Sequence, residues 1–151
     1  MGKKHVVSQT NEELIKETEK IDKEAKKEPK VKETVQRISE AKVYISSSYN
    51  NTIVSLADVS GKVIAWKSAG SVGFKGTKKG TAFAASKVGE TVALIAGKLG
   101  LEKVHVYVKG IGPGRDSAVR SLMTHGLNLM SIRDVTPVPH NGCRAAKVRR
   151  V

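Results

Sequence analysis

The sequence predicts an α/β domain, a mixed five-stranded sheet with two packed helices in the chain order β-β-β-α-β-α-β. Three observations predict this fold class. Short segments with apolar residues at every second position stand beside longer segments with apolar residues at every third or fourth position. Turns rich in glycine, asparagine and serine separate these segments. The last four elements alternate helix and strand as in a βαβ unit, which favours helices packed on a mixed sheet.

Three short strands begin the predicted domain, at residues 42–47, 53–57 and 62–66. The first alternates apolar and polar side chains with a period of two. The pair Asn50-Asn51 that follows it is a turn signal, because asparagine adopts left-handed backbone angles at little cost. A second turn, at residues 58–61, precedes the third strand. Three short strands joined by tight turns predict an antiparallel meander.

The first predicted helix spans about residues 81–99, with Gly100 as a C-terminal cap signal. Its apolar stripe, at i+3 and i+4 spacing, consists of Phe83, Ala84, Val88, Val92, Ile95, Ala96 and Leu99. A fourth strand at 104–108, a second helix from Arg115 to about His125 and a fifth strand at 130–135 follow. Aromatic residues make up 4% of the chain, so the core is predicted to be aliphatic.

The charge is concentrated after residue 40. The chain carries 27 Lys and Arg against 14 Asp and Glu, a net +13. Residues 1–40 hold ten basic and nine acidic side chains, which leaves 17 basic and five acidic side chains, a net +12, for residues 41–151. We expect a charged flexible arm at 1–40, an α/β domain at 41–136 and an extended basic tail at 137–151. A charge this large favours a polyanionic partner, with nucleic acid ahead of a membrane surface.

Two glycine-rich segments are candidate phosphate sites. In the loop at residues 67–80, the candidate site is 70–80. Its glycines allow close backbone approach to a phosphate, its three lysines supply charge, and the start of a helix favours anions. The alternative is a solvated flexible loop. Residues 109–115 form a strand-to-helix turn with Arg115 where a dinucleotide fingerprint requires glycine. The alternative there is a turn whose glycines serve packing only.

The tail after Thr136 is the third candidate. It is basic, contains Pro137 and Pro139, and has no apolar periodicity, so its ordering requires a charged surface to bind. A disordered solubilising tail is the alternative.

Other function classes have little support. The single cysteine, Cys143, leaves no internal disulfide or structural zinc site. No apolar run is long enough to span a membrane, and no secretory signal begins the chain.

Five segments carry a resemblance to a known family: Tyr49–Val54, Trp66–Gly70, Gly73–Lys79, Lys109–Arg120 and Asp134–Arg144. From Ala41 onward, about three-quarters of the 151 residues, the chain resembles the small-subunit ribosomal protein of the S-eleven family, in its bacterial branch. Two features depart from the family. Ala145-Ala146 stand where bacterial members usually have two prolines, and the arm before Ala41 is longer than typical.

The resemblance implies a ribonuclease-H-like topology, and a structural rather than enzymatic role on the platform of the small subunit. Expected partners are ribosomal RNA, nearby messenger RNA and exit-site tRNA, and proteins of the S-seven, S-eighteen and S-twenty-one families. We expect a cytoplasmic protein with no cofactor, metal, membrane or homo-oligomer. A generic architectural DNA-binding protein is the alternative. The residues expected to bind RNA are Asn50, Asn51, Lys67, Gly73, Phe74, Lys75, Gly76, Thr77, Lys78, Lys79, Lys109, Gly112, Pro113, Gly114, Arg115, Ser117, Arg120, His140, Asn141, Arg144, Lys147, Arg149 and Arg150.

Overall fold

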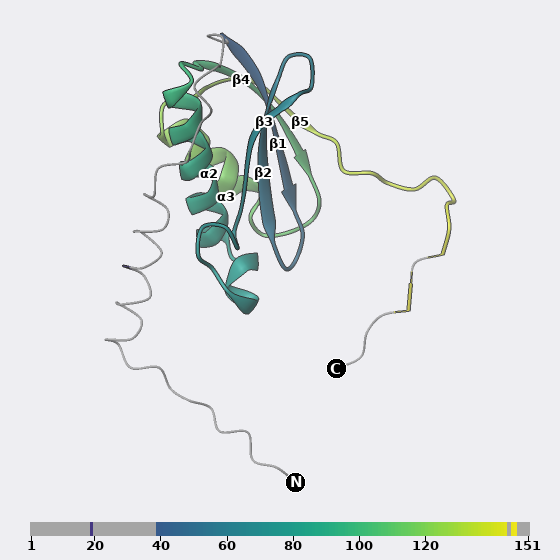
Figure 1. The fold of residues 1–151 in the computed structure, drawn as a ribbon. Coiled ribbons are helices and arrows are strands. Elements are labelled where there is room, and N and C mark those ends of the chain that lie inside the picture. The colour runs from purple at the N-terminus through teal and green to yellow at the C-terminus, as the bar shows by residue number, and fades with distance from the viewer. Residues whose placement is uncertain (1–18, 20–38, 145, 148–151) are drawn as a thin grey trace.

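The computed structural model describes residue 19, residues 39–144 and residues 146–147. Within this part of the chain the elements follow in the predicted order (Figure 1). They are β1 (Glu40–Ser47), β2 (Thr52–Asp58), β3 (Val63–Ser68), the 3-10 helix η1 (Gly76–Gly80), α2 (Ala82–Lys98), β4 (Lys103–Lys109), α3 (Arg115–Thr124) and β5 (Asn128–Asp134). The sequence predicted only a loop where η1 lies, and β1 begins at Glu40, one residue before the predicted domain start.

The five strands form one sheet in the order β3-β2-β1-β4-β5. β2 pairs antiparallel with β1 and β3, whereas β4 pairs parallel with both β1 and β5. Strand β2 therefore runs against the other four, which is the ribonuclease-H-like arrangement that the resemblance implied. The predicted fold class, a mixed five-stranded sheet with two helices, is confirmed.

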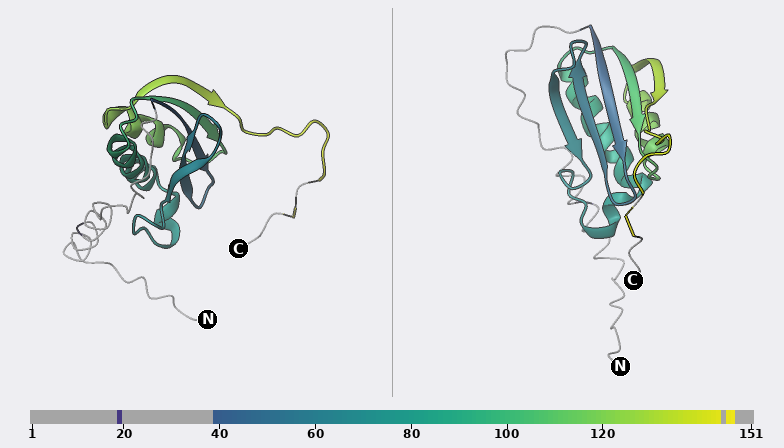
Figure 2. Two further views of the ribbon diagram at one scale, coloured as in Figure 1. Left: turned by 45° about the horizontal axis from the view of Figure 1, so that its top comes forward. Right: turned by 90° about the vertical axis from the view of Figure 1, so that its right-hand side faces the viewer.

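Helices α2 and α3 cover the same face of the sheet (Figure 2). Alternate residues of the central strands point into this layer and are buried, among them Val43, Ile45, Val54, Leu56, Val104 and Val106. The predicted aliphatic core is present: Phe74 is the only aromatic side chain among its buried residues in the described part of the chain. The opposite face of the sheet carries Tyr44 and Trp66, which are 39% and 61% exposed.

Helix α2 has the ends that its sequence predicts. The Thr81 hydroxyl accepts a hydrogen bond from the Ala84 amide at 3.2 Å, which caps the first turn. Gly100 adopts a φ of +70°, and the Leu101 amide donates to the Ala96 carbonyl at 3.0 Å. This is a Schellman ending, which requires a residue that tolerates left-handed angles.

The predicted apolar stripe of α2 is wrong at Phe83. This side chain is 55% exposed although Ala84 and Ala85 beside it are buried, and its ring meets Phe74 edge to face at 5.9 Å. The stripe also omitted small residues that α3 needs. Gly89 is buried against α3, where an added Cβ would lie 2.9 Å from the Ala118 carbonyl oxygen. The Ser121 hydroxyl donates to the Ser86 carbonyl at 2.6 Å across the same contact.

Candidate nucleic-acid interface

The two glycine-rich segments and the turn that contains Asn50 and Asn51 meet at one end of the sheet. At this end β1 and β4 finish, and α2 and α3 begin (Figure 1). We call this region the glycine end and define it as residues 47–52, 67–81, 109–116 and 134–136. The Gly112 amide donates to the Ser47 carbonyl at 3.0 Å, and the Ala69 amide donates to the Thr52 carbonyl at 3.0 Å. The turn between β1 and β2 therefore lies between the two glycine-rich segments and joins them.

Glycines at this end allow backbones to touch. A Cβ on Gly80 would overlap the Tyr49 carbonyl, and one on Gly112 would overlap the Ser48 carbonyl. At Gly114 an added Cβ would lie 2.6 Å from the Ala85 Cβ. Gly112 and Gly114 are buried, whereas Pro113 between them is exposed. The packing role considered for this turn thus has direct structural support, and Pro113 is the part of it that faces solvent.

The loop between β3 and α2 is anchored in the domain. Phe74 is 5% exposed and Val72 is 2% exposed, so both side chains belong to the core. The Phe74 amide donates to the Ala69 carbonyl at 3.1 Å. Phe74 was expected among the RNA contacts, but its ring faces the protein interior. The residues that follow it, Lys75 to Lys78, are exposed, and Lys79 is half-buried.

The glycine end is electropositive. Its six basic residues are Lys67, Lys75, Lys78, Lys79, Lys109 and Arg115, and its two acids are Asp116 and Asp134, which leaves a net +4. Helices α2 and α3 both begin here, so their unpaired N–H groups add partial positive charge. Asn50 is exposed, and Asn51 is half-buried with a side-chain oxygen that has no hydrogen-bond partner among the described residues. This combination of charge and exposed loop backbone suits phosphate groups.

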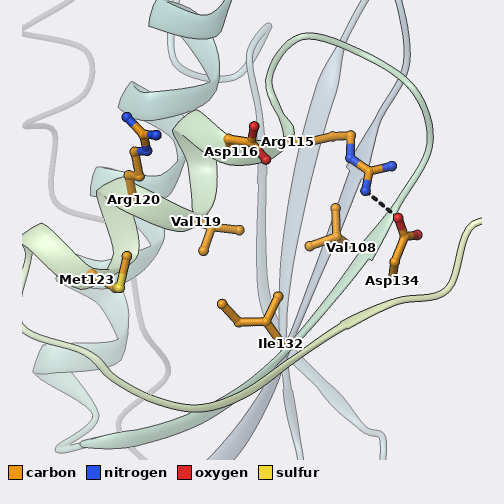
Figure 3. Close-up of a pocket in the computed structure, with 8 residues that line it drawn as sticks. All are labelled: Val108, Arg115, Asp116, Val119, Arg120, Met123, Ile132 and Asp134. Carbon is orange, nitrogen blue, oxygen red and sulfur yellow. Dashed lines mark hydrogen bonds and ion pairs between the residues drawn. The ribbon is translucent and has the colours of Figure 1, made fainter.

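Arg115 has partners within the chain (Figure 3). Its guanidinium donates to the Asp134 carboxylate and to the Gly110 carbonyl. The Thr136 hydroxyl donates to the same carboxylate at 2.5 Å and accepts from the Gly110 amide at 3.1 Å. The network ties the glycine turn to the end of β5, where the tail leaves the domain. Arg115 therefore holds the glycine turn against the end of β5, and its contact with RNA stays a prediction.

The sequence reasoning did not identify Asp134 and Thr136 as members of the site. Hydrogen bonds from Thr136, followed by the Arg115 guanidinium, hold the pKa of Asp134 well below its usual range. A signal for this turn existed: aspartate often accepts from the backbone amide two residues later, and the Thr136 amide donates to Asp134 at 2.9 Å. The partner Arg115, 19 positions earlier, could not be identified from local sequence.

The remaining predicted contacts lie on α3, next to the glycine end, and in the tail. On α3, Ser117 is half-buried and Arg120 is exposed beside a groove of about 300 Å³ between α3, β4 and β5 (Figure 3). The tail runs away from the domain (Figure 1), and its predicted contacts His140, Asn141, Arg144 and Lys147 are exposed. Asn141 adopts a φ of +56°. Arg149 and Arg150 lie outside the described residues.

The part of the chain that the structure describes contains no candidate metal site and no candidate membrane span. No three His, Cys, Asp or Glu side chains there come together as metal ligands. None of the helices in that part is both long and apolar enough to cross a lipid bilayer.

Comparison with known proteins assigns the family. Residues 41–150 match the family model described as Ribosomal protein S11. Two curated relatives, from two strains of Treponema pallidum, are both named small ribosomal subunit protein uS11. Each is 51% identical over 114 residues, which cover 76% of this chain and 90% of the relative. The match includes the glycine end and most of the tail, and the chain therefore belongs to the ribosomal protein S11 family.

Proposed function

We propose that this protein is a structural constituent of the small ribosomal subunit that binds ribosomal RNA through the glycine end and the basic tail. The observation that carries the proposal is the convergence of four segments, separated in sequence, into one closely packed electropositive surface with a net +4 charge. Its membership in the ribosomal protein S11 family supports the same role. The role is architectural and requires no catalytic group.

The glycine end is suited to reading RNA shape. Lysines act as point charges toward phosphates, and phosphate contacts position a protein without reading base sequence. The exposed residues that would make these contacts are Lys75, Thr77, Lys78 and Lys109. Because neighbouring backbones hold the loops, little ordering of the loops is required when RNA binds.

The tail extends the interface beyond the domain. Its described residues are exposed, and Arg144 and Lys147 carry charge toward solvent. An extended basic segment of this kind becomes ordered on a polyanion, where counterion release offsets the cost of ordering the chain. The arm at 1–40 lies almost wholly outside the described residues, and we propose that it is separate from the RNA-binding domain.

Family membership supports a finer placement. We propose a site on the platform of the small subunit, near the messenger exit path and exit-site tRNA, with S-seven, S-eighteen and S-twenty-one family members as neighbours. The protein is then cytoplasmic as part of the ribosome.

The test is to follow the intact protein in cell extract at moderate salt and to map its crosslinks. Co-sedimentation with small subunits, with crosslinks from the glycine end and tail to ribosomal RNA, is the expected result. Recovery on chromosomal DNA would instead support the architectural DNA-binding alternative. Crosslinks to subunit RNA from other surfaces only would refute the assignment of the interface.

A further inference from the structure

The sheet face opposite the helices carries a row of aromatic side chains. Strand register pairs Trp66 on β3 with Ser55 on β2, Ser55 with Tyr44 on β1, and Tyr44 with Tyr107 on β4. The four side chains therefore stand side by side across the sheet, on the face that α2 and α3 leave uncovered (Figure 2). Trp66 is 61% exposed and Tyr44 is 39% exposed, so the row faces solvent in the described structure.

The geometry of the row leaves one slot between two rings. The Tyr44 and Tyr107 rings stack, with centroids 5.1 Å apart and planes 18° apart. Because each covers one face of the other, the open face of Tyr44 is directed toward β2. There the short side chain of Ser55 separates Tyr44 from Trp66. Neighbouring strands lie about 4.8 Å apart, so Tyr44 and Trp66 are roughly 10 Å apart at the backbone. The backbone spacing is wide enough for a flat ring above Ser55, which would extend the tyrosine stack.

Cations surround the aromatic row. Strand alternation places four basic side chains on this face, Lys42, Lys103, Lys109 and Arg133, against one acid, Glu40, which leaves a net +3. Lys42 also donates to the Val59 carbonyl at 2.7 Å, which holds its amino group at the edge of the sheet. A partner that presents flat rings together with negative charge fits this surface. Single-stranded nucleic acid has both properties, whereas an apolar protein segment offers no charge to match the cations.

We propose that this face binds unpaired RNA nucleotides, with one base stacked above Ser55 between Tyr44 and Trp66 and the surrounding cations directed at phosphates. The inference rests on the proposed RNA-binding function. It adds a second contact surface, which shares Lys109 with the glycine end and recognises bases rather than backbone shape. Duplex RNA does not fit, because its bases are already stacked within the helix.

Trp66 reports directly on the slot because it is the only tryptophan in the chain. The full-length protein is titrated at one ionic strength with an unstructured uridine decamer, an RNA duplex of equal length, and polyphosphate. We expect the decamer to quench Trp66 fluorescence, and the duplex and polyphosphate to leave it nearly unchanged. Equal quenching by polyphosphate would show a response to charge alone and would overturn the proposal.

Variants separate stacking from charge. Trp66→Leu is expected to weaken decamer binding by at least about 5-fold, with an unchanged salt dependence, because the ring that stacks on the base is removed. Trp66→Phe retains a ring and should bind like the wild type, and thermal melts check that both variants are folded. If Trp66→Leu binds the decamer as the wild type does, the slot is not a base site.

The same experiments distinguish failure of this inference from failure of the proposed function. If the protein binds a ribosomal RNA fragment and Trp66 plays no part, the proposed function stands and the base site is refuted. If the protein binds no RNA, both are refuted. In assembled subunits, a photo-crosslinker at position 66 should attach to RNA. Attachment only to a neighbouring protein would assign the face to a protein partner and overturn the inference.

Discussion

The two ends of the sheet differ in what their glycines allow. At the opposite end, defined as residues 58–62, 98–103 and 125–128, Gly61, Gly100 and Gly126 have φ between +70° and +93°, and an added Cβ would meet nothing within 4 Å. At the glycine end, Gly80, Gly112 and Gly114 have no positive φ, but an added Cβ would strike a neighbouring loop. The opposite end needs glycine only for the path of single turns. The glycine end needs it for this too, at Gly73, Gly76 and Gly110, and in addition so that separate loops can touch.

Charge follows the same division. The opposite end has three lysines and two acids, a net +1, whereas the glycine end has a net +4. A rigid and strongly positive end is suited to bind a large polyanion, because its charges are already held in place before binding. The difference shows that a glycine in a turn is not by itself a sign of contact between loops.

The largest expected effect is on stability. Gly112→Ala should destabilise the fold by about 3 kcal/mol, because the new methyl group overlaps the Ser48 carbonyl and forces the two turns apart. Gly61→Ala, the matched control, should cost only about 1–2 kcal/mol, since it strains one turn in open space. Urea unfolding of both variants measures the difference. Equal losses of unfolding free energy in the two variants would contradict the difference between the two ends.

The next effect is on RNA affinity. The double variant Lys78→Ala/Lys79→Ala should weaken binding to a ribosomal RNA fragment and flatten its salt dependence by roughly 0.7–0.9 slope units for each phosphate that the variant no longer neutralises. Lys62→Ala/Lys98→Ala removes the same charge from the opposite end and should leave the slope nearly unchanged. Filter binding across a salt series tests both. Equal slopes in the two variants would show that net charge, and not its position, governs binding.

A third prediction concerns the tail. Truncation after Gly142 should weaken incorporation into small subunits and change the free energy of unfolding by less than about 0.5 kcal/mol, because His140 to Arg144 are exposed. In the free protein, amides in residues 137–147 should exchange rapidly, and on the subunit they should be protected. Protection already present in the free protein would show that the tail packs on its own domain.

The smallest expected effect concerns the ion pair between Arg115 and Asp134. Because the pKa of Asp134 is lowered in the folded state, its contribution to stability is complete above about pH 4 and is lost as the pH falls toward the folded pKa. Asp134→Asn should therefore be less stable than the wild type at pH 7, and the difference should narrow below pH 4. Thermal melts of both proteins from pH 7 to pH 2.5 measure it. A constant difference would show that ionisation of Asp134 contributes nothing.

The sequence by itself determined the elements and the net charge. Periodicity located all five strands and both helices, because apolar spacing depends only on neighbouring residues. The Thr81 cap and the Gly100 ending were local for the same reason. The two glycine-rich segments and the tail were identified as candidates from composition, since glycines and lysines close together show where a phosphate can bind.

Only the tertiary structure decided which of these residues face outward and which hold one another. Phe74 became core because α2 begins beside it and places Phe83 against its ring. Gly112 became a packing residue because the parallel pairing of β1 and β4 brings their ends together. Arg115 forms an ion pair with Asp134 because β5 pairs with β4 and ends at Asp134. Each of these contacts joins residues that are well separated in the chain, and local periodicity carries no information over such separations.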